Sequence, residues 1–233
     1  MIGTLINVAA ILVGVALGLV LRRGMKPRVS QTVMQGVGLS VVLIGLSGAL
    51  ETENTLLVIL SMVLGGVAGS LLDIQARMDR LGQWAQRRLS RGGEGADNTF
   101  AQGFVTASLV FCVGAMAVVG ALDSGIRGDH STLIAKSALD GVAAAVFASS
   151  MGVGVMLSAV PVLVYQGLIA LLGTVVAPLL SDSVITEMSA VGGLLIAAIG
   201  LNMVLDKDIK VANLLPAILV PFLYFPIYRL IVG

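Results

Sequence analysis

The sequence predicts an all-α protein, a polytopic transmembrane helix bundle with about eight spans. The first observation is composition: 57% of the 233 residues are hydrophobic, 12% are charged, and the mean hydropathy is +1.02. Soluble domains do not reach these values together. The second observation is a series of apolar runs, each close to the ~20 residues that cross a hydrocarbon core about 30 Å thick. Together they place the chain in a lipid bilayer.

The apolar runs divide the chain into eight candidate spans. In order they are Gly3 to Leu21, Gln31 to Leu50, Thr55 to Leu72, Phe100 to Leu122, Thr132 to about Leu157, about Pro161 to Leu180, Glu187 to Leu205, and Leu214 to Ile231. The first run lacks the basic start and small-residue cleavage site of a secretory signal, so we expect it to remain as a span. The boundary between the fifth and sixth spans is the weakest, because no charged loop divides residues 132–180.

The basic residues predict the orientation, since Lys and Arg in short loops stay in the cytoplasm. With eight spans, one side receives eleven of the fourteen basic residues: Arg22, Arg23, Lys26, Arg28, Arg77, Arg80, Arg87, Arg88, Arg91, Lys207 and Lys210. The other side receives only Arg127 and Arg229, together with the acids Glu51, Glu53, Asp123, Asp129, Asp182 and Glu187, and Lys136 falls inside a span. We therefore expect a multi-pass protein of the cell inner membrane with both termini outside the cytoplasm.

The whole chain, 1–233, reads as a single integral membrane domain. It divides into a first three-helix unit (1–73), a cytoplasmic amphipathic linker helix (74–98), two central spans (99–157) and a second three-helix unit (158–233). The linker carries an apolar stripe at helical spacing, with Trp84 beside it and arginines on the other face. It suits either a helix lying on anionic head groups or a solvated helix touching another part of the protein.

An internal likeness links the two three-helix units. Gly38 to Leu50 aligns with Gly193 to Leu205 at an offset of 155, which also places span one over span six and span three over span eight. Five spans separate each pair, so the copies would be inverted, as in many secondary transporters. A weaker likeness between Ser47–Leu50 and Val119–Leu122 would instead imply a same-sense duplication.

Glycine pairs four residues apart indicate close helix contacts. Gly14 with Gly18 and Gly65 with Gly69 have this spacing, which lets helix backbones approach one another in a membrane. The same faces suit contact between subunits, so we expect a homo-oligomer, most simply a homodimer.

Lys136 and Asp140 are the ionisable residues that most need a reason inside a span. They are four residues apart and share one helical face, and a helix starting near Thr132 would place Asp140 roughly 12 Å deep. Each charge costs about 2.5–3.5 kcal/mol to insert. They form either a structural ion pair, or a site in which Asp140 titrates or binds a cation and Lys136 is its counter-charge or an anion ligand.

A run of small and polar residues follows Asp140. It contains Ser149, Ser150, Gly152, Gly154 and Ser158, which weaken a helix. Freed backbone groups must be buried in protein or line a wet cavity, and helix ends exposed there could hold an ion. The run is either such a broken-helix site near the membrane midplane or a tight cytoplasmic turn between spans.

Two asparagines complete the candidate site. Asn7 in the first span and Asn202 in the seventh place amides among apolar neighbours, where hydrogen bonding between helices is their simplest role. The offset of 155 does not relate them. Gln166 and Tyr165 read as packing residues.

Other chemistry is not supported by the sequence. Cys112 is the only cysteine and lies in an apolar run, and His130, the only histidine, lies in a short polar loop. We therefore expect no metal, no cofactor and no catalytic residues, and hence no enzyme. A net charge of +1 without basic–aromatic clusters argues against a nucleic-acid partner.

Three segments carry a family resemblance: Gly3 to Gly14, Phe111 to Leu122 and Lys136 to Gly167. They resemble the YqgA and YdfK type of bacterial integral membrane proteins, and the likeness covers essentially the whole chain. It implies an inner-membrane location and an unassigned function for which transport is the expected role. It implies no ligand residues.

The sequence thus predicts a small inner-membrane transporter of an ion or small solute. The alternative is a non-transporting scaffold or a sensor partner that uses the basic linker helix. The expected partners are the lipid bilayer, a small solute or ion, and a second copy of the chain.

Overall fold

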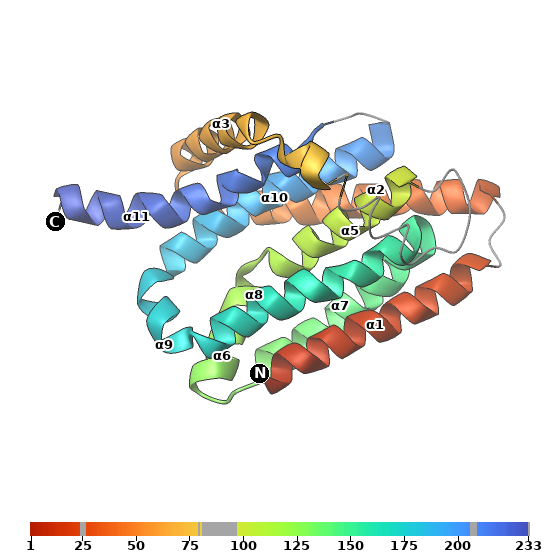
Figure 1. Cartoon of the computed structure of the whole chain (residues 1–233), viewed down its shortest axis with the longest axis horizontal. Coiled ribbons are helices and arrows are strands. Elements are labelled where there is room, and N and C mark those ends of the chain that lie inside the picture. Colours follow the sequence, from red (N-terminus) through yellow and green to blue (C-terminus); the bar gives the residue numbers. More distant parts are fainter. Residues whose placement is uncertain (24–26, 79, 81–96, 206–208, 233) are drawn as a thin grey trace.

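The structure, a computed structural model, describes residues 1–23, 27–78, 80, 97–205 and 209–232, and in these its regular elements are all helices. They form an elongated bundle (Figure 1). In chain order, with η for 3₁₀ helices, they are α1 (Ile2–Arg23), α2 (Pro27–Ala49), α3 (Thr55–Leu71), α5 (Asp97–Cys112), α6 (Ala115–Ile126), α7 (Ser131–Met151), η1 (Gly152–Ser158), α8 (Ala159–Leu171), α9 (Gly173–Val176), η2 (Ala177–Leu179), α10 (Asp182–Leu205), η3 (Val211–Ile218) and α11 (Leu219–Val232).

Four helical segments are long and apolar enough to cross a membrane: 2–22, 31–49, 131–171 and 182–205. The bent pair α5 and α6 would make a fifth, and residues 55–71 and 211–225 form shorter apolar helices. The predicted all-helical membrane fold is confirmed. The count of eight spans is not confirmed and stays a prediction. Most of the predicted linker helix, residues 81–96, lies outside the described residues.

The segment 131–171 turns back on itself at η1. Gly152 lies against the guanidinium of Arg22, at the C-terminal end of α1. Gln166, by contrast, is hydrogen-bonded to Asn7 near the start of α1. The chain therefore runs along α1 in α7 and returns in α8. Gly152 has φ +84°, a conformation that favours glycine. We call the two ends of the bundle the η1 end and the N-terminal end.

Glycines allow α1 and α7 to pack closely side by side. Gly14 touches the backbone of Gly141, and Gly18 touches the backbone of Ala145. On α3, Gly65 and Gly69 meet Ala217 and Asn213 of η3 in the same way. The close helix contacts predicted from both glycine pairs are confirmed within the chain.

The antiparallel helices α2 and α10 make a second close contact. Gly45 packs against Gly193, and Gly38 packs against Gly200. Side chains at Gly45, Gly193 or Gly200 would collide with backbone; a methyl group on Gly193, for example, would lie 2.6 Å from the Ala49 nitrogen. The two helices therefore approach at backbone distance over two turns.

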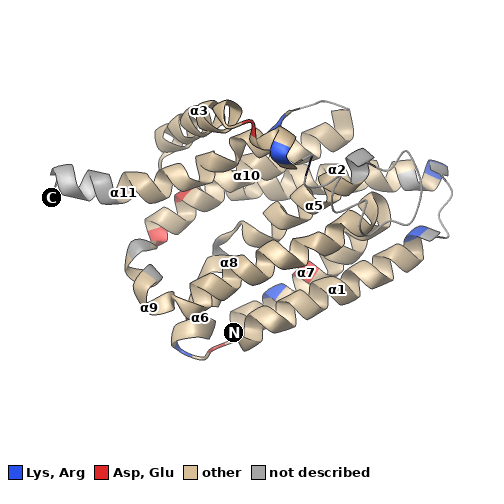
Figure 2. Ribbon diagram, viewed as in Figure 1, with Lys and Arg blue, Asp and Glu red and all other residues tan. Residues whose placement is uncertain are grey.

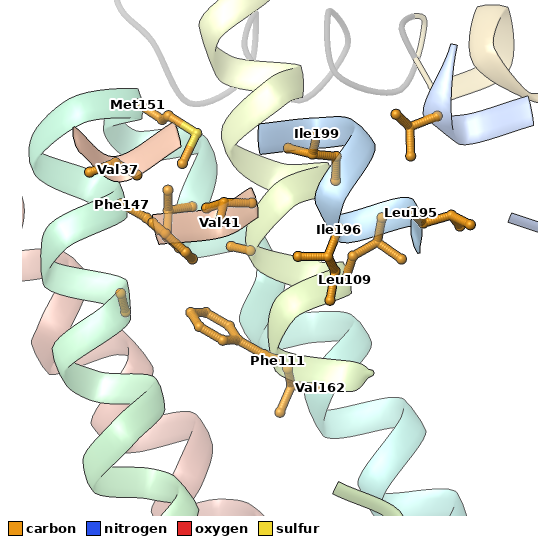
Figure 3. Packing of buried hydrophobic residues seen from close by; sticks show 14 of the residues in the cluster. Val37, Val41, Leu109, Phe111, Phe147, Met151, Val162, Leu195, Ile196 and Ile199 are labelled. Atoms are coloured by element: carbon orange, nitrogen blue, oxygen red, sulfur yellow. The ribbon is translucent and has the colours of Figure 1, made fainter. Parts of the chain in front are cut away.

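Buried apolar side chains from α2, α5, α7, α8 and α10 converge in one core (Figure 3). Phe111 of α5 stacks on Phe147 of α7 with ring centroids 6.0 Å apart. Val41, Val162 and Leu195 are fully buried around them. This core joins the α1–α7–α8 group to the α2–α10 pair.

Several predicted spans differ from the observed helices. The span from about Pro161 to Leu180 is divided among α8, α9 and η2. The span from Phe100 to Leu122 is bent by 60° between α5 and α6, because Gly114 has φ +113° and interrupts the helix. The last span begins as the 3₁₀ helix η3. Pro216 lies within that segment and has no backbone N–H to continue an α-helix.

The glycine contacts between α2 and α10 predict a stability difference. Gly193→Ala or Gly200→Ala forces two backbones apart and should destabilise the protein by about 1–3 kcal/mol. Gly36→Ala is the matched control, since nothing lies within 4 Å of the added methyl group, and it should be neutral or stabilising. Thermal unfolding in detergent measures all three. Equal melting temperatures for the three variants would contradict the packing.

Candidate functional site

Four buried polar side chains meet between α1, α7 and α8. On α7, the Lys136 ammonium donates to both carboxylate oxygens of Asp140, at 2.8 and 2.7 Å. Both side chains are 7% exposed. On α1, Asn7 Nδ2 donates to Asp140 Oδ2 at 3.0 Å and to Gln166 Oε1 of α8 at 3.3 Å. We call Asn7, Lys136, Asp140 and Gln166 the polar cluster.

Local sequence places each member of the polar cluster. The i,i+4 spacing puts Lys136 and Asp140 on one face of α7, and Gly141 and Gly14 bring α1 close enough for Asn7 to reach Asp140. The turn at η1 then returns Gln166 to the same level. Asp140 lies nine residues into α7, which is ~14 Å along the helix from its first residue.

The polar cluster is electrically neutral but not fully hydrogen-bonded. The carboxylate only accepts hydrogen bonds, which fixes Asn7 with its Nδ2 toward Asp140. Asn7 Oδ1 and Gln166 Nε2 then have no partner within the described part of the chain, and neither has Thr4 Oγ1, one turn away on α1. Asn7, Gln166 and Thr4 are fully buried. Buried polar atoms without partners are rare in proteins, and each one calls for an explanation such as an ordered water or a bound ion.

The surroundings of the polar cluster differ toward the two ends of the bundle. Toward the η1 end, Ile11 lies one turn from Asn7 and Val162 one turn from Gln166, and Phe147 follows on α7; all three are buried. Toward the N-terminal end lie Thr4 and Ser137, which are also buried. Toward the η1 end the cluster therefore meets apolar side chains, whereas toward the N-terminal end the hydroxyl groups of Thr4 and Ser137 lie beside the buried Leu133.

The break between α5 and α6 adjoins the polar cluster. Cys112, the last residue of α5, is close enough for the charges of Lys136 and Asp140 to act on its thiol. Gly114 follows at a positive φ, and no side chain caps the start of α6. The helix interruption nearest the ion pair is therefore here. Sequence reasoning missed it because Gly114 is one of 29 glycines.

The serine and glycine run forms the turn at η1. The hydroxyl groups of Ser149, Ser150 and Ser158 donate to backbone carbonyls of the preceding turn. Gly154 packs on the backbone of Phe100, and Gly152 lies against Arg22. Of the two interpretations left open, the structure has the turn between antiparallel helices. These five residues make no described hydrogen bond to the polar cluster.

Asn202 lies apart from the polar cluster. Near the end of α10, its side chain exchanges two hydrogen bonds with the backbone of Ile209, at 2.8 and 3.0 Å. It holds the chain where it enters η3. Asn7 and Asn202 therefore have different roles. Gln166, which sequence reasoning treated as a packing residue, belongs to the cluster instead; its only signal was an amide within an apolar run.

Glu187 is a second buried acid, on α10 near the N-terminal end. Its Oε1 accepts from the backbone N–H groups of Glu53 and Asn54, at 2.8 and 2.9 Å, and its Oε2 accepts from the Thr52 hydroxyl at 2.7 Å. Only 1% of the residue is exposed. Sequence reasoning placed Glu187 at the start of a span, but α10 begins five residues earlier at Asp182, so Glu187 is enclosed.

Ionisable residues are sparse along the helices and lie mostly near their ends (Figure 2). Among the described residues, no group of three or more His, Cys, Asp or Glu side chains could hold a metal ion. The polar cluster therefore offers one acid, one base and two amides. It can hold an ion or a small polar group, or exchange a proton.

The ion pair predicts a non-additive stability change. Asp140→Ala leaves the Lys136 ammonium buried without its partner, which should destabilise the protein by about 3–5 kcal/mol. Replacing both residues, as Lys136→Met with Asp140→Leu, removes both charges and should restore most of the stability. Thermal unfolding of the single and double variants in detergent tests this. If the double variant is as unstable as Asp140→Ala, the unpaired charge is not the cause of the lost stability.

Comparisons with known proteins agree with a membrane protein. The family model described as "Protein of unknown function (DUF554)" matches residues 2–225. The chain is 29% identical to "Uncharacterized membrane protein YdfK" of Bacillus subtilis (strain 168) over 225 residues, covering 95% of this chain and 94% of the relative. It is 34% identical to "Uncharacterized protein YqgA" of Escherichia coli (strain K12) over 220 residues, covering 94% and 93%. No solved structure matches. The resemblance seen in the sequence is confirmed, and the chain belongs to the DUF554 family of membrane proteins.

Proposed function

We propose that the protein is a small inner-membrane transporter of an ion or small solute, with the polar cluster as its binding site. The observation that carries the proposal is an ion pair with unpartnered amide atoms, buried between three helices at mid-depth. Ionisable residues at this depth are costly and usually belong to a translocation path. The interrupted helix α5–α6 beside the cluster is a second feature common in transporters.

An inverted repeat supports this proposal. Under the offset of 155, Gly38 corresponds to Gly193, and Gly45 corresponds to Gly200. The contact between Gly38 and Gly200 therefore maps onto the contact between Gly193 and Gly45, and both are present. Such an exchange is what a two-fold axis in the membrane plane produces, and it favours the inverted over the same-sense duplication.

The same offset relates the polar cluster to an apolar counterpart. Asn7 corresponds to Val162, and Gln166 corresponds to Ile11; both counterparts are fully buried one turn closer to the η1 end. We infer that the two inverted units differ in polarity at these positions because transport requires a binding site in one unit and an apolar barrier in the other. In the contact between α1 and α8, Asn7 and Gln166 would bind the polar ligand. Ile11 and Val162 would close the translocation path on the side of the η1 end.

The alternative is a non-transporting scaffold or sensor partner that uses the basic linker helix. A scaffold has no need for the unpartnered polar atoms in the polar cluster, so these atoms favour transport. An enzyme is less well supported, because the cluster lacks an activated nucleophile: Ser137 donates its hydroxyl to the Leu133 carbonyl. We also propose that the protein forms a homodimer through its lipid-facing helices, which crosslinking in membranes can test.

A ligand screen tests the transport proposal. The purified chain is tested against sodium, potassium, chloride and small organic acids by thermal shift, and in proteoliposomes by flux. At least one solute should raise the melting temperature and should cross the bilayer. At 100 times its Kd, the solute should raise the free energy of unfolding by ~2.7 kcal/mol. Both effects should be lost in the Lys136→Met and Asp140→Leu double variant, whose charges are absent.

Arg127→Gln is the matched control for the ligand screen. Arg127 forms an exposed ion pair with Asp123 at 3.2 Å, outside the bundle core, so its loss should change neither stability nor flux by much. The transport proposal fails if no solute stabilises or crosses with the native protein. It also fails if the double variant behaves like the native protein.

The orientation follows from the basic residues, with the η1 end proposed to face the cytoplasm. Lys210→Cys and Arg127→Cys, each in a Cys112→Ala background, place single thiols at exposed positions. In intact cells, a membrane-impermeant thiol reagent should label the cysteine at position 127 and not the one at 210. The reverse labelling pattern would show that the protein has the opposite orientation in the membrane.

A further inference from the structure

The charge of the polar cluster restricts what it can bind. The opposite charges of Lys136 and Asp140 cancel, and the two residues lie in a medium of low dielectric constant, where a net charge is strongly disfavoured. A lone anion or a lone cation would leave such a net charge. A ligand therefore has to arrive neutral, or as an ion accompanied by a compensating proton.

Hydrogen bonds within the polar cluster restrict the size of the ligand. Contacts of 2.7–3.3 Å join the four side chains, and each residue is at most 6% exposed. A ligand can enter only where the Lys136 ammonium leaves the Asp140 carboxylate, which the flexible lysine stem allows. That place suits an ion of a few atoms.

The two unpartnered amide groups indicate which ion. Among the residues that the structure describes, the donor Gln166 Nε2 and the acceptor Asn7 Oδ1 have no hydrogen-bond partner. If Asp140 is protonated, its new O–H can donate to Asn7 Oδ1 after the amide rotates, and this rotation gives up the hydrogen bond from Asn7 Nδ2 to Gln166 Oε1. The released Lys136 ammonium and Gln166 Nε2 are then two donors for an anion. One orphan atom thus matches a proton, and the other matches an anion.

We propose that the polar cluster binds a small monovalent anion together with one proton. This proposal rests on the proposed transport function. The proton comes from bulk water and forms an O–H bond on Asp140. The Lys136 ammonium keeps its protons and exchanges the carboxylate for the anion as its counter-charge. The charge of the cluster is zero before and after binding.

Few other charged groups lie on the helices around the ion pair. On α2, which packs against α7, the one charged residue is Arg28 in the first turn. On α5, Cys112 lies within range of both charges, and on α8, Tyr165 lies within range of Cys112. Arg22 of α1 lies at the η1 end beside Gly152. On α6, Asp123 is paired with Arg127. Asp140 is therefore the acid placed to receive the proton.

Proton uptake measures the proposal directly. Sodium formate, nitrate and chloride are added to the purified full chain in weakly buffered detergent with a pH dye, and sodium gluconate is the bulky-anion reference. At least one of the small anions should bind with about one proton taken up per anion, and its apparent Kd should rise about tenfold for each pH unit. Gluconate should do neither. Anion binding without proton uptake, or no binding by any small anion, would overturn the proposal.

Two variants separate the roles of acid and base. In Asp140→Asn the side chain stays neutral, so anion binding should persist with an affinity that no longer depends on pH. In Lys136→Gln anion binding should be lost. If Asp140→Asn is folded and its binding keeps the native pH dependence, another group takes up the proton. If a variant does not fold, the pH dependence of the native protein alone decides the proposal.

The outcome also separates this inference from the proposed function. If the screen finds a cation or a neutral solute that crosses the bilayer, while small anions neither bind nor take up protons, transport stands and the anion proposal falls. If no solute of any class binds or crosses, both fall.

Discussion

The burial of one ion pair in an apolar medium is the constraint on which the rest of the structure depends. Lys136 and Asp140 are tolerable in this interior only while they bind each other and the Asn7 amide, which in turn donates to Gln166. Those amides come from α1 and α8, so all three helices must assemble at one level. The glycines that let α1 approach α7, and the turn at η1 that brings α8 back, are the means of that assembly.

Some of this arrangement could be predicted from the sequence, because it is local. The four-residue spacing of Lys136 and Asp140 fixes their common face, and the glycine pairs indicate helix contacts. Gln166 could not be assigned, since its partner Asn7 is 159 residues away. The bend at Gly114 was equally hidden, because a positive φ leaves no mark in a chain rich in glycine.

The helices divide the work between rigidity and adaptability. The α2–α10 pair is held at backbone distance by glycines on both sides, so it behaves as one stiff unit. The polar cluster lies outside that pair, beside an interrupted helix and among side chains with unused hydrogen-bonding capacity. A ligand at the proposed site would therefore exchange by rearranging side chains whose hydrogen bonding is incomplete, and the α2–α10 pair could stay as it is.

Glu187 gives this division a mechanical consequence. Its carboxylate, carried by α10, is grasped by the turn between α2 and α3 through three hydrogen bonds that water cannot readily replace. Separating these segments at the N-terminal end would leave the carboxyl group of Glu187 buried without its hydrogen-bond partners. These three hydrogen bonds therefore tie the first turns of α10 to the turn between α2 and α3, so that the two segments should move together.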